Sequence, residues 1–196
     1  PVGSALEIYL GDYLDRGPDS FGVVERLVRR QAQGRALCLA GNHERAALAA
    51  LGSPSAFLSW LSWGAAETLV SYGIRPPDRR PADLTRAFLE FGRRFPAPHR
   101  QFLEALPLFH LHERYAFVHA GLRPGVAIQN QSPEDLTTIR RPFLDHRGSH
   151  PHLVVHGHTP VREPEFPGNR INLDTGAFAT GRLSCLVIEG DDLRLL

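Results

Sequence analysis

Short apolar runs alternate with amphipathic stretches in the N-terminal part of the chain. Residues 6–10 and 36–40 are apolar enough to be buried strands, and each run stops at a glycine. Pro18–Ser20 opens a helix between them. Its apolar face is predicted to consist of Val23, Val24, Leu27 and Val28. A second helix is expected from about Glu44 to Leu51, and this order of elements predicts two parallel strands joined by a right-handed crossover.

Residues from about 53 to 106 have a different pattern of apolar and polar positions from this alternating segment. Aromatic and leucine side chains crowd three stretches there, and prolines at 76–77 and 96–98 separate the stretches. We predict a helical insert packed on the sheet. We interpret its aromatic stripe as core rather than as a platform for a ligand; the stripe includes Phe57, Trp60, Trp63, Phe88 and Phe91.

Strand-like runs return in the C-terminal part of the chain. Residues 115–118 and 153–155 are short apolar runs, and residues 170–173 alternate polar and apolar side chains. Each of the three strand-like runs leads directly into a His or an Asp. Residues 183–188 and 193–196 are expected to form a terminal hairpin across a Gly-Asp-Asp turn. The whole chain, residues 1–196, is predicted to be one domain.

Five polar clusters stand at the ends of these runs, and each places Asp, Asn or His beside glycine. They are GDYLDRG at 11–17, GNHE at 41–44, HAG at 119–121, HGHT at 156–159 and DTG at 174–176. In open α/β sheets, sites form beyond the carboxyl ends of the strands. Carboxylate, amide oxygen and imidazole are ligands that divalent metals prefer. The clusters therefore predict a multi-ligand metal site and favour a metal-dependent phosphoesterase.

The composition narrows the class of protein without naming a function. The chain is 42% apolar and 22% charged, which is typical of a globular protein. A net charge of +1 gives no electrostatic reason to expect a nucleic-acid or membrane partner. Cys38 and Cys185 both lie in apolar runs, so we expect two buried free thiols and a cytoplasmic location.

The motifs GDYLDRG, GNHE, HAG and GHT resemble, in this order, those of the phosphoprotein phosphatase branch of the calcineurin-like metallophosphoesterases. The resemblance extends over the chain from Leu6 onward. It implies an α/β fold, an α-β-β-α sandwich of mixed sheets with flanking helices. It also implies a bacterial Ser/Thr-type protein phosphatase that hydrolyses phosphomonoesters with a metal-activated water.

The same resemblance implies a set of metal ligands. Asp12 corresponds to the carboxylate that bridges two cations, and Asn42 to a ligand of the second cation that also contacts phosphate. His119 and His158 complete that second metal site. Two divalent ions are implied, with Mn²⁺ preferred and Fe or Zn also compatible with oxygen and nitrogen ligands. His156 remains open between an accessory role at the metal and plain packing.

The remaining predicted site residues are expected to donate a proton or to bind phosphate. By the resemblance, His43 is the general acid, and Asp15 orients it and favours its protonated form. A salt bridge with Arg16 is the alternative role of Asp15. Arg16 and Arg140 are expected to bind phosphate oxygens, which suits a planar guanidinium. Glu44 is expected to support its loop or to cap the helix rather than to touch substrate.

One motif of the family does not occur in the given sequence. The family carries an earlier GDxHG whose Asp and His bind the first metal, and none of the eleven residues before Asp12 is Asp or His. We expect that the missing strand and motif precede the given sequence. The alternative is a natural chain without them, which would bind a single metal or be inactive.

Three functions follow from these observations. The residues of the motifs GDYLDRG and GNHE favour a protein phosphatase that acts on a phosphorylated protein or a small phosphoester. A dinucleoside tetraphosphate hydrolase of the same branch is the close alternative. The third possibility is a degenerate module that binds phosphate through Arg16 and Arg140 without catalysis. Nucleic acid and membrane are not expected as partners.

Overall fold

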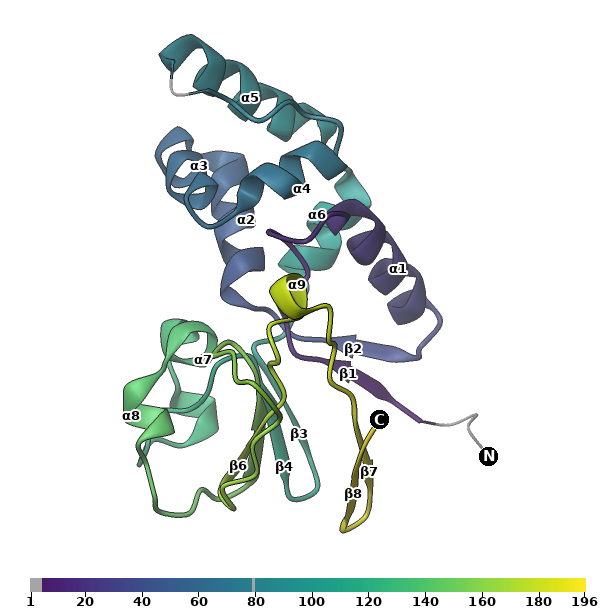
Figure 1. The fold of residues 1–196 in the computed structure, drawn as a ribbon, viewed down its shortest axis with the longest axis vertical. Helices are drawn as coiled ribbons and strands as arrows, with labels where there is room; N and C mark the ends of the chain where they lie inside the picture. The colour runs from purple at the N-terminus through teal and green to yellow at the C-terminus, as the bar shows by residue number, and fades with distance from the viewer. Residues whose placement is uncertain (1–4, 79) are drawn as a thin grey trace. The chain divides into compact units, whose positions relative to one another are not determined.

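The computed structural model describes residues 5–78 and 80–196. The chain divides into two compact units, Pro1–Pro107 and Leu108–Leu196. Both units contain helices and strands, so the predicted α/β fold class is confirmed (Figure 1). The strands of the described residues form a parallel pair, a mixed four-stranded sheet and an antiparallel hairpin.

The first unit is built on the predicted strand–helix–strand–helix order. Strand β1 (Glu7–Tyr9) pairs in parallel with β2 (Ala36–Cys38), and α1 (Ser20–Ala32) connects them. Asp19 caps α1, because its Oδ1 accepts a hydrogen bond from the backbone N–H of Gly22 at 2.8 Å. Helix α2 (Asn42–Gly52) follows β2. In α1 the prediction for Val23 is wrong, since this side chain is exposed whereas Val24 is buried.

Four more helices follow among the described residues of the first unit. They are α3 (Pro54–Leu61), α4 (Ala65–Ser71), α5 (Pro81–Arg94) and α6 (Ala97–Glu104). Phe57, Trp60 and Phe91 are buried, and the rings of Trp60 and Phe91 lie 4.8 Å apart between centroids. The interpretation of the aromatic stripe as core therefore holds for these residues. It does not hold for Trp63, which is 40% exposed.

The second unit is centred on a four-stranded sheet in the order β3-β4-β5-β6. The strands are β3 (Phe109–His112), β4 (Tyr115–Val118), β5 (Leu153–His156) and β6 (Arg170–Asn172). Strands β4, β5 and β6 are parallel, so their carboxyl ends meet at the same edge of the sheet. Strand β3 pairs antiparallel with β4 and was not predicted, although its residues alternate between apolar side chains and histidines.

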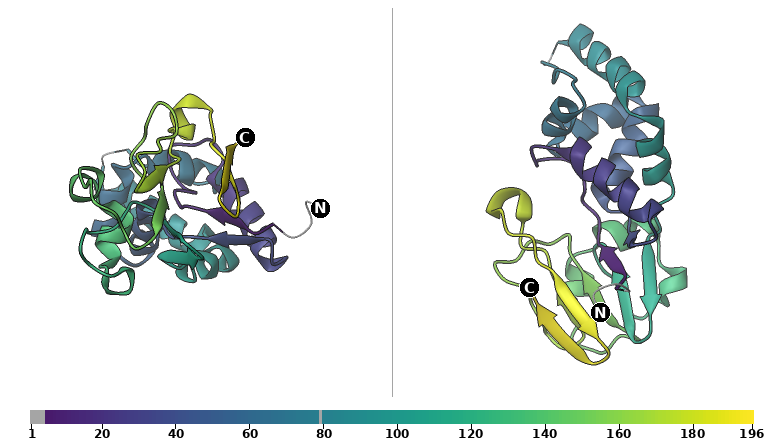
Figure 2. Two further views of the ribbon diagram at one scale, coloured as in Figure 1. Left: turned by 90° about the horizontal axis from the view of Figure 1, so that it is seen from below. Right: turned by 90° about the vertical axis from the view of Figure 1, so that its right-hand side faces the viewer.

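Short helices and a hairpin surround this sheet. They are η1 (Ile128–Asn130), α7 (Pro133–Thr138), α8 (Arg141–Leu144), α9 (Ala177–Thr180), β7 (Leu186–Glu189) and β8 (Asp192–Leu195). The core between α7, α8 and the sheet includes Val118, Phe143 and Val154. The predicted terminal hairpin is confirmed as β7 and β8, the yellow strands of Figure 2. Among the described residues, we find no helix with the length and apolarity needed to cross a membrane.

The two cysteines differ in their surroundings. Cys38 is buried in β2, as predicted, whereas Cys185 is exposed, so the prediction for Cys185 is wrong. The reason is that Cys185 precedes β7, a strand of the hairpin, in which every residue is exposed or only half-buried. An apolar run there does not mark a core strand.

We expect the two thiols to react at very different rates. Burial raises the pKa of Cys38 to about 12, so almost no thiolate forms there at neutral pH. In the native protein, a thiol-specific disulfide reagent at pH 8 should modify Cys185 rapidly and Cys38 only on unfolding. Rapid modification of both thiols, measured by intact mass, would contradict the structure.

Candidate active site

The residues predicted for the site fall into two clusters, one on each unit. We call Asp12, Asp15, Arg16, Asn42 and His43 the N-terminal cluster. His119 and His158 form the C-terminal cluster, on the second unit. Every member follows the carboxyl end of a strand or begins the helix after it. The expected arrangement at strand ends is therefore present within each unit.

The loop after β1 has an unusual backbone. Asp12, Asp15 and Arg16 have φ angles of 59°, 72° and 61°, in the left-handed region that non-glycine residues seldom adopt. Such conformations persist only where surrounding contacts hold them, and they concentrate at functional sites. The loop is therefore shaped by specific contacts rather than by local preference.

Glu44 supplies those contacts from the start of α2. Its buried carboxylate accepts hydrogen bonds from the backbone N–H groups of Gly41 at 2.9 Å, Asp12 at 3.0 Å and Tyr13 at 2.7 Å. One side chain thus joins the loop after β1 to the loop after β2. The expectation that Glu44 supports its loop is confirmed.

His43 and Asp15 form a buried pair. The Nδ1 atom of His43 lies 2.6 Å from Oδ2 of Asp15. The same Oδ2 accepts a hydrogen bond from Nε1 of Trp60 at 2.8 Å, and Oδ1 accepts one from the Thr68 hydroxyl at 2.7 Å. Sequence reasoning missed both helical residues. The signal for Trp60 was its indole N–H, since a buried tryptophan needs an acceptor.

Two opposing effects act on the pKa of His43. Burial of the ring lowers this pKa, because a charged imidazole loses solvation. The hydrogen bond to Asp15 raises it, as do the negative charges of Asp12, Asp15 and Glu44. The pKa of His43 is raised overall, so the surroundings favour the form that can donate a proton.

Arg16 is held by the turn between α3 and α4. Its backbone N–H donates to the carbonyl of Gly64 at 2.9 Å, and its Nε donates to the carbonyl of Trp63 at 3.2 Å. Gly64 has a φ of 94°, and a Cβ there would lie 2.6 Å from Cγ of Arg16. Asn42 is half-buried at the first position of α2.

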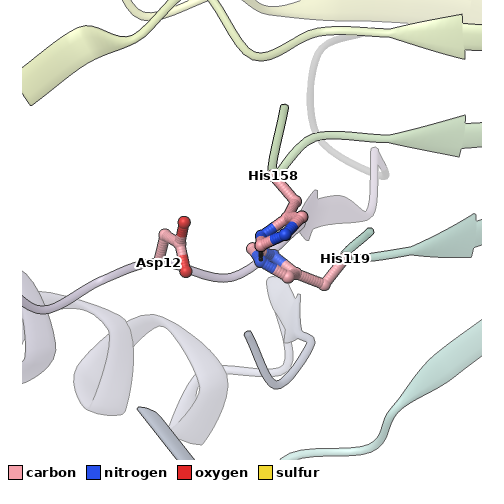
Figure 3. A group of neighbouring side chains, drawn as sticks. All are labelled: Asp12, His119 and His158. Carbon is pink, nitrogen blue, oxygen red and sulfur yellow. Dashed lines mark hydrogen bonds between the residues drawn. The ribbon is translucent and has the colours of Figure 1, made fainter. Parts of the chain in front are cut away.

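In the C-terminal cluster two imidazoles approach each other (Figure 3). Nε2 of His119 and Nδ1 of His158 are 3.2 Å apart, and the backbone N–H of Gly157 donates to the His119 carbonyl at 2.8 Å. Two nitrogens that bind one cation at about 2.0–2.1 Å each are about 3.0–3.4 Å apart at ordinary coordination angles. The spacing of this pair therefore fits a shared metal ion.

His156 is fully buried beside this cluster. Its Nδ1 donates to the carbonyl of Gly157 at 3.0 Å, and its ring packs edge-on against Phe143. Burial lowers the pKa of His156 to about 4, so the ring is neutral at pH 7. Within the described residues its Nε2 has no hydrogen-bond partner. Both roles considered for His156 remain compatible with this geometry.

The segment that contains Arg140 packs on the loop after β4. Arg140 is exposed at the N-cap of α8, and its carbonyl accepts a hydrogen bond from the N–H of Leu144 at 2.8 Å. Phe143 of the same helix lies so close to Gly121 that a Cβ there would overlap its ring. This close approach explains the glycine of the HAG motif. The phosphate-binding role of Arg140 stays a prediction.

The comparison with protein families identifies the chain. The sequence model of the calcineurin-like phosphoesterases matches residues 5–184. The chain belongs to this family.

Several proteins that are similar to this phosphoesterase are named bis(5'-nucleosyl)-tetraphosphatases. It is 26% identical to an asymmetrical bis(5'-nucleosyl)-tetraphosphatase, PrpE, of Anoxybacillus flavithermus, over 95% of this chain and 76% of that protein. A protein of the same name from Bacillus anthracis is 32% identical over 101 residues, which are 42% of this chain and 40% of the relative.

Solved structures share the fold. A crystal structure provisionally named a diadenosine tetraphosphatase has a TM-score of 0.67 at 23% identity, over 99% of this chain and 81% of the other. A protein serine/threonine phosphatase of Saccharomyces cerevisiae, similar to human PP5, has a TM-score of 0.58 at 15% identity, over 97% of this chain and 69% of the other. At these identities the likeness concerns the fold alone.

We expect Gly41→Ala to disrupt the N-terminal cluster. The new Cβ would lie 2.7 Å from carboxylate oxygens of Asp12 and Glu44 and 2.8 Å from the Asp12 nitrogen. Overpacking of this kind costs about 1–3 kcal/mol, which urea unfolding measures. Gly52→Ala, in the same helix, is the matched control, because no atom of another described segment lies within 4 Å of its Cβ position. Equal stability of the two variants would contradict the account.

Thr68→Val should weaken the support of Asp15. This isosteric change removes the hydroxyl that donates to Oδ1 of Asp15, and a lost hydrogen bond to a buried charged group costs about 1.5–3 kcal/mol. Thermal unfolding of the variant should show the loss. The control is Thr85→Val in α5, which loses only a solvent-exposed hydrogen bond to the Pro81 carbonyl, with an expected change within about 0.5 kcal/mol. A Thr68→Val protein as stable as the control would show that this contact is unimportant.

Proposed function

We propose that this protein is a metal-dependent hydrolase of dinucleoside tetraphosphates. The buried His43–Asp15 pair, joined at 2.6 Å, is the observation that carries the hydrolytic role, because it holds an imidazole ready to donate a proton. The nucleotide substrate is supported by the names of the relatives that match most of the chain. The residues of the motifs alone favour a protein phosphatase first and a dinucleoside tetraphosphate hydrolase second. The proposal reverses that order.

The metal ligands in this proposal come from both clusters. Asp12, His119 and His158, drawn in Figure 3, each offer an atom that can bind a metal ion. Asn42 adds a neutral amide oxygen. Bound divalent cations would neutralise phosphate charge and lower the pKa of water, which supplies the nucleophile. Mn²⁺ is our preferred ion, and these oxygen and nitrogen donors also suit Fe and Zn.

The protein residues then divide the remaining work. His43 donates a proton to the leaving oxygen from Nε2, since its Nδ1 is held by Asp15. Arg16 presents its guanidinium to phosphate oxygens, and its place is fixed by the Trp63 and Gly64 carbonyls. Asn42 and Arg140 are proposed as further phosphate contacts.

A Ser/Thr protein phosphatase is the second candidate. The residues of the motifs GDYLDRG and GNHE favour this candidate. The buried acid His43 favours it as well, because a serine alkoxide is a poor leaving group unless it is protonated. When a phosphoanhydride is cleaved, the leaving group is the phosphate of a nucleotide, which is a far weaker base than an alkoxide. Its departure therefore depends less on protonation by the acid. Loss of His43 should therefore reduce cleavage of a phosphoserine peptide more than cleavage of diadenosine tetraphosphate.

Turnover of the two substrates by the Mn²⁺-loaded protein tests the proposal. We expect a higher kcat/KM for diadenosine tetraphosphate than for a phosphoserine peptide. The reverse order would establish the protein phosphatase. Binding of Mn²⁺ and phosphate without turnover of either substrate would instead support the non-catalytic module.

His43→Asn should lower kcat for a phosphoserine peptide by about 10²–10⁴-fold, the usual contribution of a positioned general acid, and kcat for diadenosine tetraphosphate by a smaller factor. Calorimetry should show that Mn²⁺ still binds. His112→Asn is the matched control, because His112 is exposed at the end of β3, and we expect it to retain full turnover. Wild-type kcat in the His43→Asn protein would exclude His43 as the acid.

A further inference from the structure

Trp63 stands apart from the other aromatic residues of the helical segment. It lies in the turn between α3 and α4, and its backbone N–H donates to the carbonyl of Trp60 at 2.9 Å. Trp63 is 40% exposed, whereas Trp60 is 1% exposed. A single exposed aromatic residue is common on protein surfaces and carries no function by itself. The position of Trp63 distinguishes it.

Trp63 contacts two members of the N-terminal cluster. Its indole lies 5.7 Å from the imidazole of His43 between ring centroids, with the planes at 72°. Its carbonyl accepts the hydrogen bond from Nε of Arg16 at 3.2 Å. An exposed indole is therefore placed beside the proposed proton donor and the proposed phosphate ligand.

The turn holds the backbone of Trp63 in a fixed place. Gly64 is the N-cap of α4 and has a left-handed conformation, and its carbonyl accepts a hydrogen bond from the backbone N–H of Arg16. Ala65, the next residue, is fully buried. Because the backbone on both sides of Trp63 is hydrogen-bonded, little ordering is needed when a planar group stacks on the ring.

We infer that the indole of Trp63 stacks on a nucleobase of the substrate and so sets the preference for nucleotides. This inference rests on the proposed function, and it adds the residue that would recognise the base. Stacking of a base on an aromatic side chain tolerates any base, because every base has a π face. Arg16, which this turn holds through the Trp63 and Gly64 carbonyls, contacts the phosphate next to the base. The turn and the loop after β1 would thus contact the two parts of a nucleotide.

A structural role for Trp63 makes a different prediction. If the indole only packs against His43, its loss should weaken every ligand of the site to the same extent. If it stacks on a base, its loss should weaken nucleotides and spare inorganic phosphate. The comparison of AMP with phosphate therefore separates the two roles.

The test is the dissociation constant of AMP and of inorganic phosphate for the Mn²⁺-loaded protein, measured by calorimetry. For Trp63→Leu we expect the AMP constant to rise about tenfold more than the phosphate constant. Trp63→Phe keeps a smaller aromatic face and should fall between Trp63→Leu and the wild type. Leu58→Ala, at an exposed position of α3, is the control and should change neither constant.

Any other pattern in Trp63→Leu overturns the inference, whether both constants rise equally, neither changes or phosphate is affected more. Trp63→Phe guards against misfolding, since its thermal unfolding midpoint should match that of the wild type. Binding of AMP does not depend on turnover. A protein that fails to hydrolyse diadenosine tetraphosphate therefore disproves the proposed function without deciding this test.

Discussion

The N-terminal cluster depends on one buried carboxylate, that of Glu44. A buried charge is costly unless hydrogen bonds satisfy it, and here three backbone N–H groups do so. These donors come from two loops that lie far apart in the sequence. The left-handed conformation of Asp12 is compatible with a stable fold because this side chain holds the loop in place.

The helices of residues 53–106 also take part in the chemistry that we propose. Trp60 from α3 and Thr68 from α4 both donate to the carboxylate of Asp15, which in turn holds His43. The turn between the same two helices holds Arg16. The aromatic core thus fixes the positions of the proposed proton donor and of a proposed phosphate ligand, which links packing to the function that we propose.

The sequence predicted those features that have a local signal. Glycine after an apolar run located the strand ends, and the polar residues that follow β1, β2, β4 and β5 lie where the motifs indicated. Features that depend on tertiary packing could not be predicted. Cys185 lies in an apolar run that no core covers, and the exposure of Trp63 follows from its place in a turn.

The substrate is a similar case. The residue types in the motifs indicate binding of phosphate and metal, which is the chemistry that the members of the branch share. It says little about the group attached to the phosphate. In our inference that group is recognised by a side chain outside the motifs, Trp63. For this reason the named relatives and the surroundings of Arg16 bear more on the proposed substrate than the motifs do.

Anomalous diffraction from crystals of the Mn²⁺-loaded protein tests the central claim most directly. The account predicts manganese peaks within coordination distance of Asp12, Asn42, His119 and His158. Manganese bound elsewhere, or absent at saturating concentration with these four side chains turned away from a common centre, would contradict it.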